Sequence, residues 1–100
     1  MTAITRSSHG DPAFRLNELL RQARLCLRRG DLNRAAVYFD RAHDVNPATP
    51  CGAIGMALVA TLLNRFADAA AILDRVDAKF PEIPESGACR RFLTRRMQTV

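Results

Sequence analysis

The sequence repeats itself with a period of 34 residues, and this repeat limits the possible folds more than any other feature. Adding 34 to a residue number in the first part of the chain often gives the same amino acid or a similar one. The matching pairs are Ala23 with Ala57, Leu32 with Phe66, Ala35 with Ala69, Asp40 with Asp74, Arg41 with Arg75 and Pro47 with Pro81. A unit of this length cannot bury its apolar face alone and must stack on a neighbouring copy. The repeat therefore predicts a solenoid.

The first unit reads as two helices joined by a tight turn. Asp11 and Pro12 are suited to the N-cap and the first helical position of the first helix, and Gly30 ends it. Asp31 is suited to cap the second helix, which ends before Pro47 because proline cannot continue it. Apolar residues follow helical spacing in both segments.

The second unit has the same form. A helix is predicted from Pro50 to about Leu63 and another from Phe66 to about Lys79, with a turn at Asn64 between them. Asn64 stands where the first unit has Gly30, and both residue types tolerate the positive φ that such a turn requires. No segment alternates with period two over a strand's length, so the predicted fold class is all-α.

A last helix is predicted over residues 85–98 as a cap on the second unit. Its apolar residues Cys89, Phe92, Leu93 and Met97 are expected on one side. Its arginines Arg90, Arg91 and Arg95 are expected largely on the other.

Small residues on the predicted helix faces indicate close packing. Ala23 and Ala35 would let the two helices of the first unit approach closely, and Phe39 would fill the gap toward the next unit. Aromatic residues make up only 6% of the chain, so a core built mainly of Ala, Leu, Val and Ile is expected.

Length and composition agree with one small folded domain. The chain has 100 residues, 48% of them hydrophobic and 25% charged, which is typical of a globular protein. Residues 1–10 carry no signal-peptide pattern and are predicted to be a flexible arm, and residues 11–100 a single helical domain. No run approaches the length of a membrane span, so we expect a cytoplasmic protein without one.

The three cysteines, Cys26, Cys51 and Cys89, are widely spaced and include no C-x-x-C pair. This pattern indicates neither a disulfide framework nor a zinc site. Each cysteine is expected to be a small buried residue.

These features resemble the tetratricopeptide repeat family. The first unit has the family's small residues and its aromatic residue, glycine and proline, at Ala23, Gly30, Ala35, Phe39, Ala42 and Pro47. It departs from the family at Leu19 and Cys26, where the family favours Trp and Tyr. The resemblance implies a short right-handed α-solenoid with repeats over about 16–49 and 50–83 and a capping helix over about 85–98.

By the same resemblance, a concave groove lined by the first helix of each unit would bind a partner protein. Its expected lining is Asn17, Leu20, Arg24, Leu27, Arg28, Cys51, Ile54, Leu58, Thr61 and Leu62. Family members that clamp a C-terminal carboxylate carry Lys and Asn at the positions of Leu20 and Arg24, so a carboxylate clamp is not expected here. An apolar groove edged by arginines is suited to an amphipathic helix or a hydrophobic segment.

Two other interpretations remain open. Leu20, Ile54 and Leu62 would instead pack the helices against each other, because a thin core needs much of its own leucine. The net charge of +5 and two arginine clusters, at 21, 24, 28 and 29 and at 90, 91, 95 and 96, would instead serve nucleic acid. No aromatic residues interleave with these arginines for base stacking, so a protein partner is preferred.

No catalytic, cofactor-binding or metal-binding residues are predicted. His9 lies in the expected arm, His43 lies in the last turns of a helix, and no nucleophile–base grouping or phosphate loop is present. We therefore expect a non-enzymatic adaptor that forms hetero- or homo-oligomers. Its size, repeat number and groove polarity are similar to those of small tetratricopeptide chaperones of bacterial type III secretion, which hold a secretion subunit.

Overall fold

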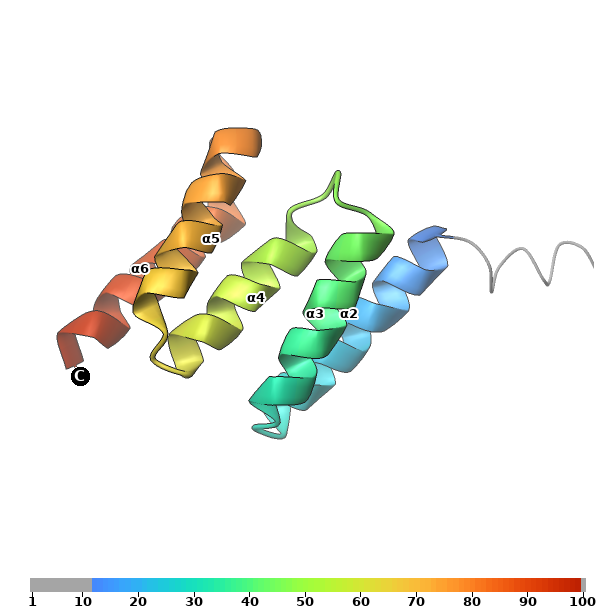
Figure 1. Cartoon of the computed structure of the whole chain (residues 1–100), viewed down its shortest axis with the longest axis horizontal. Coiled ribbons are helices and arrows are strands. Elements are labelled where there is room, and N and C mark those ends of the chain that lie inside the picture. The colour runs from blue at the N-terminus through green and yellow to red at the C-terminus, as the bar shows by residue number, and fades with distance from the viewer. Residues whose placement is uncertain (1–11, 100) are drawn as a thin grey trace, which may run out of the picture.

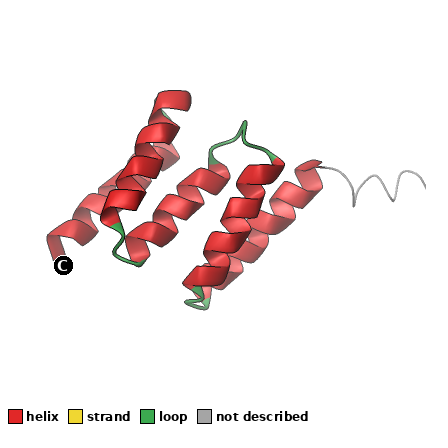
Figure 2. Cartoon of the chain, in the orientation of Figure 1, coloured by secondary structure: helices red, strands yellow, loops and turns green. Residues whose placement is uncertain are grey.

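The computed structural model describes residues 12–99, and this range contains five helices and no strand (Figures 1 and 2). The helices are α2 (Pro12–Arg28), α3 (Leu32–Val45), α4 (Cys51–Leu62), α5 (Phe66–Lys79) and α6 (Pro84–Thr99). The predicted all-α fold class is confirmed. The predicted N-terminal arm, His9 and the cap at Asp11 lie outside the described residues.

The turns within the two helix pairs form as predicted. Gly30 has a φ of 76° and Asn64 a φ of 61°, so both residues occupy the left-handed region that lets one helix end and the next begin. The Asp31 side chain accepts a hydrogen bond from the Arg34 backbone N–H at 3.3 Å. This bond satisfies one of the free N–H groups at the start of α3.

The five helices form a row of antiparallel neighbours in which α4 is central. Helix α4 packs against α3, α5 and α6. In Figure 1, α3 and α5 lie toward the viewer, whereas α2 and α6 lie behind them. Helices α2 and α6 therefore form the two ends of the row.

The core consists of two adjoining clusters, one between α2, α3 and α4 and one between α4, α5 and α6. Ala23 and Ala35 are completely buried and Phe39 is 5% exposed, which confirms their predicted inward positions. The second cluster has Ala57, Ala69 and Leu73 at its centre, each completely buried. Small residues at these positions allow close packing between neighbouring helices.

Two glycines that the sequence interpretation passed over set the contact between the two repeats. A Cβ atom at Gly52 would lie 2.7 Å from the backbone oxygen of Phe39 and 2.7 Å from the backbone nitrogen of His43. A Cβ atom at Gly55 would overlap the ring of Phe39. Phe39 packs toward the next unit, as predicted, because α4 has only glycine at positions 52 and 55.

Helix α6 packs on α5 as α4 packs on α3. The buried residues Ser86, Cys89 and Leu93 of α6 follow Gly52, Gly55 and Val59 of α4 by 34 positions.

Two residues of α6 depart from a simple division into a buried apolar side and a free polar side. Met97 is 53% exposed, because it lies one turn beyond Leu93 and is not part of the core cluster. Arg90 is held toward α5 by two of its carboxylates and does not lie on a free solvent face.

The predicted burial of all three cysteines is wrong in one case. Cys26 and Cys89 are buried, as predicted, whereas Cys51 is exposed. Cys51 is the first residue of α4 and belongs to neither core cluster.

Candidate functional site

The predicted groove residues differ in burial and fall into half-buried apolar side chains and exposed polar ones. Four leucine or isoleucine side chains are half-buried, and we call them the inner row: Leu27 of α2, and Ile54, Leu58 and Leu62 of α4. Asn17, Arg24 and Arg28 of α2 are exposed. Leu27 packs against the first core cluster, and Ile54 and Leu58 pack against the second, so each presents only part of its side chain to solvent.

Two predicted groove residues belong to the core, so their assignment to the groove is corrected. Leu20 is 6% exposed and lies in the first cluster. Thr61 is completely buried, and its hydroxyl donates a hydrogen bond to the Ala57 carbonyl at 2.8 Å. For Leu20, the alternative interpretation as core packing is the correct one, because a small core needs this leucine.

Helix α4 carries no charged residue between Cys51 and Leu62. A helix that is apolar on all sides is normally buried on all sides. Here α4 packs against α3, α5 and α6, yet several of its large side chains stay only half-buried, among them Ile54, Met56 and Leu58. The uncovered sides are therefore candidate interaction surfaces.

One such side is hollowed. Two adjoining hollows of about 360 and 380 Å³ lie between α3 and α5, and both are lined by Met56, Ile72 and Arg75. We call them together the α3–α5 groove. Its floor is formed by Ala53, Met56, Ala60 and Leu63, and Ala36 and His43 of α3 lie along the opposite edge from α5.

Charged residues are unevenly distributed along this groove. Arg65, Arg75 and Lys79 line it from the α5 side, together with one carboxylate, Asp68. All four side chains are exposed. The Lys79 ammonium also donates a hydrogen bond to the Pro47 carbonyl at 3.1 Å and lies 5.6 Å from the centre of the Phe80 ring.

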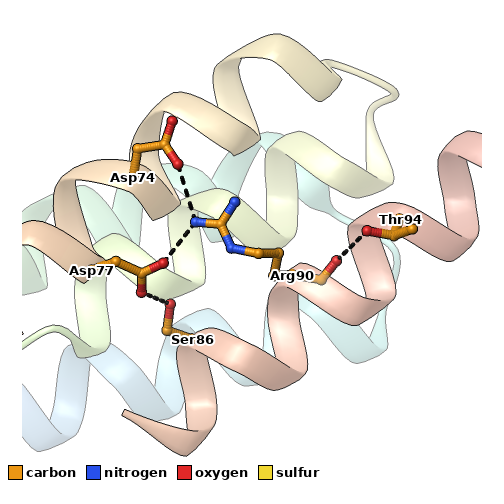
Figure 3. Close-up of polar contacts among 5 residues, drawn as sticks. All are labelled: Asp74, Asp77, Ser86, Arg90 and Thr94. Carbon is orange, nitrogen blue, oxygen red and sulfur yellow. Dashed lines mark hydrogen bonds and ion pairs between the residues drawn. The ribbon is translucent and has the colours of Figure 1, made fainter. Parts of the chain in front are cut away.

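A polar network fastens α6 to α5 (Figure 3). The Arg90 guanidinium lies 2.7 Å from Asp77 Oδ2 and 3.2 Å from Asp74 Oδ1, and the Ser86 hydroxyl donates to the other Asp77 oxygen. The hydrogen bond from Ser86, reinforced by Arg90, lowers the pKa of Asp77 below the usual range of an aspartate. The same carboxylates raise the pKa of Arg90.

Several arginines of the two clusters are engaged within the chain. Arg21 pairs with Glu18 at 2.7 Å, and that hydrogen bond lowers the pKa of Glu18. The Arg96 guanidinium donates to the Leu62 carbonyl at 3.3 Å and to the Asn64 side chain at 3.0 Å. These contacts leave fewer arginines available for an external anion than the sequence indicates.

Between residues 12 and 99, no cluster of three or more His, Cys, Asp or Glu side chains could hold a metal ion. Burial raises the pKa of the Cys89 thiol, which makes it a weaker nucleophile at neutral pH. Within the same range, no helix has both the length and the apolar character needed to cross a bilayer.

The repeated helix pairs define the chain as a helical-repeat protein. The sequence profile of the tetratricopeptide repeat family matches residues 27–87, and the chain belongs to this family. The matched region runs from the end of α2 to the first turn of α6 and contains the floor and both edges of the α3–α5 groove. No curated protein matched the chain, and no solved structure matched it either.

Proposed function

We propose that the chain is a non-enzymatic adaptor that holds an amphipathic or hydrophobic segment of a partner protein along the inner row. The observation that carries the proposal is the uncharged helix α4, whose Ile54, Leu58 and Leu62 remain only half-buried. Full burial of an exposed leucine or isoleucine contributes roughly 1.5–3 kcal/mol, and these half-buried side chains would gain the part of it that folding has not already provided. Arg24 and Arg28 border the row and favour a partner with acidic flanks.

A more specific form of the proposal is a cytoplasmic chaperone of a secretion system of the type III kind. Such a protein would hold a subunit and prevent its premature assembly. Membership of the tetratricopeptide repeat family and the apolar inner row support an adaptor of this kind. The identity of the partner decides between a dedicated secretion chaperone and a more general adaptor.

The test starts with co-purification from the native host, followed by mass spectrometry to name the partner. The recombinant partner is then titrated against Leu58→Glu, the double variant Arg24→Glu and Arg28→Glu, and the control Arg95→Glu on α6. We expect Leu58→Glu to weaken binding at least tenfold, because it would bury a charge without a counter-ion. The control should leave binding unchanged.

The double arginine variant tests binding without disturbing the core, because Arg24 and Arg28 are exposed and their replacement should leave the fold intact. It is expected to weaken the complex mainly through slower association, and binding of this variant should fall less steeply with salt than binding of the unmodified protein. The proposal is wrong if the named partner binds all three variants as tightly as the unmodified protein.

A further inference from the structure

The α3–α5 groove is a second apolar surface, separate from the inner row. Its floor residues Ala53, Met56, Ala60 and Leu63 are spaced by three, four and three positions, so they form one stripe along α4. At 3.6 residues per turn, this stripe and the row of Ile54, Leu58 and Leu62 lie on opposite sides of α4. A ligand on one surface therefore leaves the other free.

The packing of α3 explains why the chain does not fill this groove. Gly52 and Gly55 bring α3 directly onto the α4 backbone, and Phe39 occupies the space above Gly55. Helix α5 packs on another side of α4, and the stripe between the two helices lines the two hollows. Met56 and Ile72 remain half-buried there, and Leu63 is 36% exposed at one end.

The dimensions and spacing fit a helix. Helix α4 has 12 residues, which corresponds to a length of about 18 Å. A stripe with this spacing offers alternating small and large residues to a helix lying alongside it. A partner helix would meet it with apolar residues at positions i, i+3 or i+4, and i+7.

The charged residues along the groove indicate the charge of the helix that it would bind. Three exposed cations, Arg65, Arg75 and Lys79, line the α5 edge against one carboxylate, Asp68. The α3 edge is lined by Ala36 and His43 and contributes no lysine or arginine to the groove. A second copy of this chain fits poorly, because its net charge is +5 and like charges would meet at the α5 edge.

We propose that the α3–α5 groove binds an amphipathic helix of a second partner protein, with acidic side chains along the flank that faces α5. Together with the inner row, the groove makes the chain a bridge between two partners. Binding at this groove does not require the inner row to bind a partner, because the two surfaces lie on different sides of α4.

The experiment measures binding of a fluorescein-labelled synthetic helix by fluorescence anisotropy. The probe carries Leu at i, i+3, i+7 and i+10 and Glu along one flank, and a matched peptide has Lys in place of each Glu. We expect the acidic probe to bind with micromolar affinity and the basic probe at least about tenfold more weakly. Equal binding of the two probes would overturn the proposal.

Variants of the whole chain then locate the site. Leu63→Glu, at the exposed end of the stripe, should abolish binding of the acidic probe. Arg75→Glu should remove most of the preference between the two peptides, because the α5 edge would then carry two cations and two carboxylates. Arg95→Glu and the inner-row variant Leu58→Glu should leave binding of the acidic probe unchanged. Loss of binding in Leu58→Glu together with normal binding in Leu63→Glu would assign the probe to the inner row and refute the groove.

Sedimentation of the free chain tests the competing occupant. We expect the unmodified protein and Leu63→Glu to have the same mass over the concentration range of the binding assay. A dimer that Leu63→Glu dissociates would show that a second copy fills the groove, and the proposal of an acidic partner would be wrong.

Discussion

At the residue scale, the contact between Phe39 and Gly55 determines how closely the two repeats approach. The ring of Phe39 occupies the space that any side chain at position 55 would need. Phe39 is 5% exposed and lies in the first core cluster, so the ring contributes to stability both by its own burial and by covering α4. The pair acts as one packing unit, and its two members cannot be substituted independently.

Gly55→Ala is predicted to destabilise the protein by about 1–3 kcal/mol, because the added methyl group overlaps the Phe39 ring. This cost exceeds the gain of about 1 kcal/mol that alanine normally brings to a helix interior. The control is Gly87→Ala in α6, where the new Cβ would lie 3.6 Å from the Arg91 guanidinium and meet no clash. The control should be neutral or slightly stabilising in urea denaturation.

A double-mutant cycle tests the same contact more strictly. Phe39→Ala alone is predicted to cost about 3–5 kcal/mol through the cavity that it leaves. Gly55→Ala should cost less in that background, because the ring that it strikes is gone, with a coupling energy of about 0.5–3 kcal/mol. Purely additive effects would show that the ring does not pack on Gly55.

The cysteines give a second test at this scale. Cys51 is exposed, whereas Cys26 and Cys89 are buried, and burial also raises the pKa of Cys89. In the native protein at slightly alkaline pH, a thiol reagent such as DTNB should therefore react rapidly with one cysteine and slowly with the other two. Cys51→Ser should remove the rapid phase, and all three thiols of the unmodified chain should react rapidly in denaturant. A rapid phase that survives Cys51→Ser would contradict the burial pattern.

At the element scale, α6 departs from the repeat at one position. The period of 34 places Arg91 where the earlier units have Ala23 and Ala57. Both alanines are completely buried, whereas Arg91 is exposed. Helix α6 therefore packs on α5 as the first helix of a third unit would, but with an exposed arginine where the earlier units have a buried alanine.

The polar network between α5 and α6 stabilises the fold by an amount that depends on pH. The pKa of Asp77 is lowered in the folded state, so the folded protein holds this proton less tightly than the unfolded chain. The resulting stabilisation is present above the usual aspartate pKa of about 3.9 and is lost as the pH falls through the lower folded-state pKa. Asp77→Asn should lower the melting temperature at neutral pH and have a smaller effect at strongly acidic pH.

Asp40→Asn is the matched control, since Asp40 is exposed on α3 and takes no part in this network. It should shift the melting temperature little at either pH. An Asp77→Asn variant whose destabilisation is the same at neutral and acidic pH would show that the carboxylate charge does not contribute.

At the scale of the whole molecule, the sequence predicts what depends on local chemistry. The cap at Asp31 and the turns at Gly30 and Asn64 follow from the conformations that these residues prefer, and they were predicted correctly. The sequence does not show which sides of α2 and α4 are covered by other helices. This coverage determines that Leu20 and Thr61 are buried and that the α3–α5 groove exists. An all-apolar helix such as α4 has no polar face to indicate its orientation, so its periodicity could not reveal the groove.

The whole-molecule charge distribution bears on the remaining alternative, nucleic-acid binding. Arg21, Arg90 and Arg96 are engaged by groups of the chain itself. The other arginines of the clusters divide between α2 with its following turn and α6, which lie at opposite ends of the helix row (Figure 1).

We therefore predict only weak binding to a single-stranded or double-stranded oligonucleotide, lost as salt rises, because few phosphates are contacted at once. Anisotropy titrations at two salt concentrations check this. A tight complex that Arg24→Glu with Arg28→Glu abolishes, while Arg91→Glu with Arg95→Glu leaves it intact, would identify the end of α2 as a nucleic-acid site and displace the adaptor proposal.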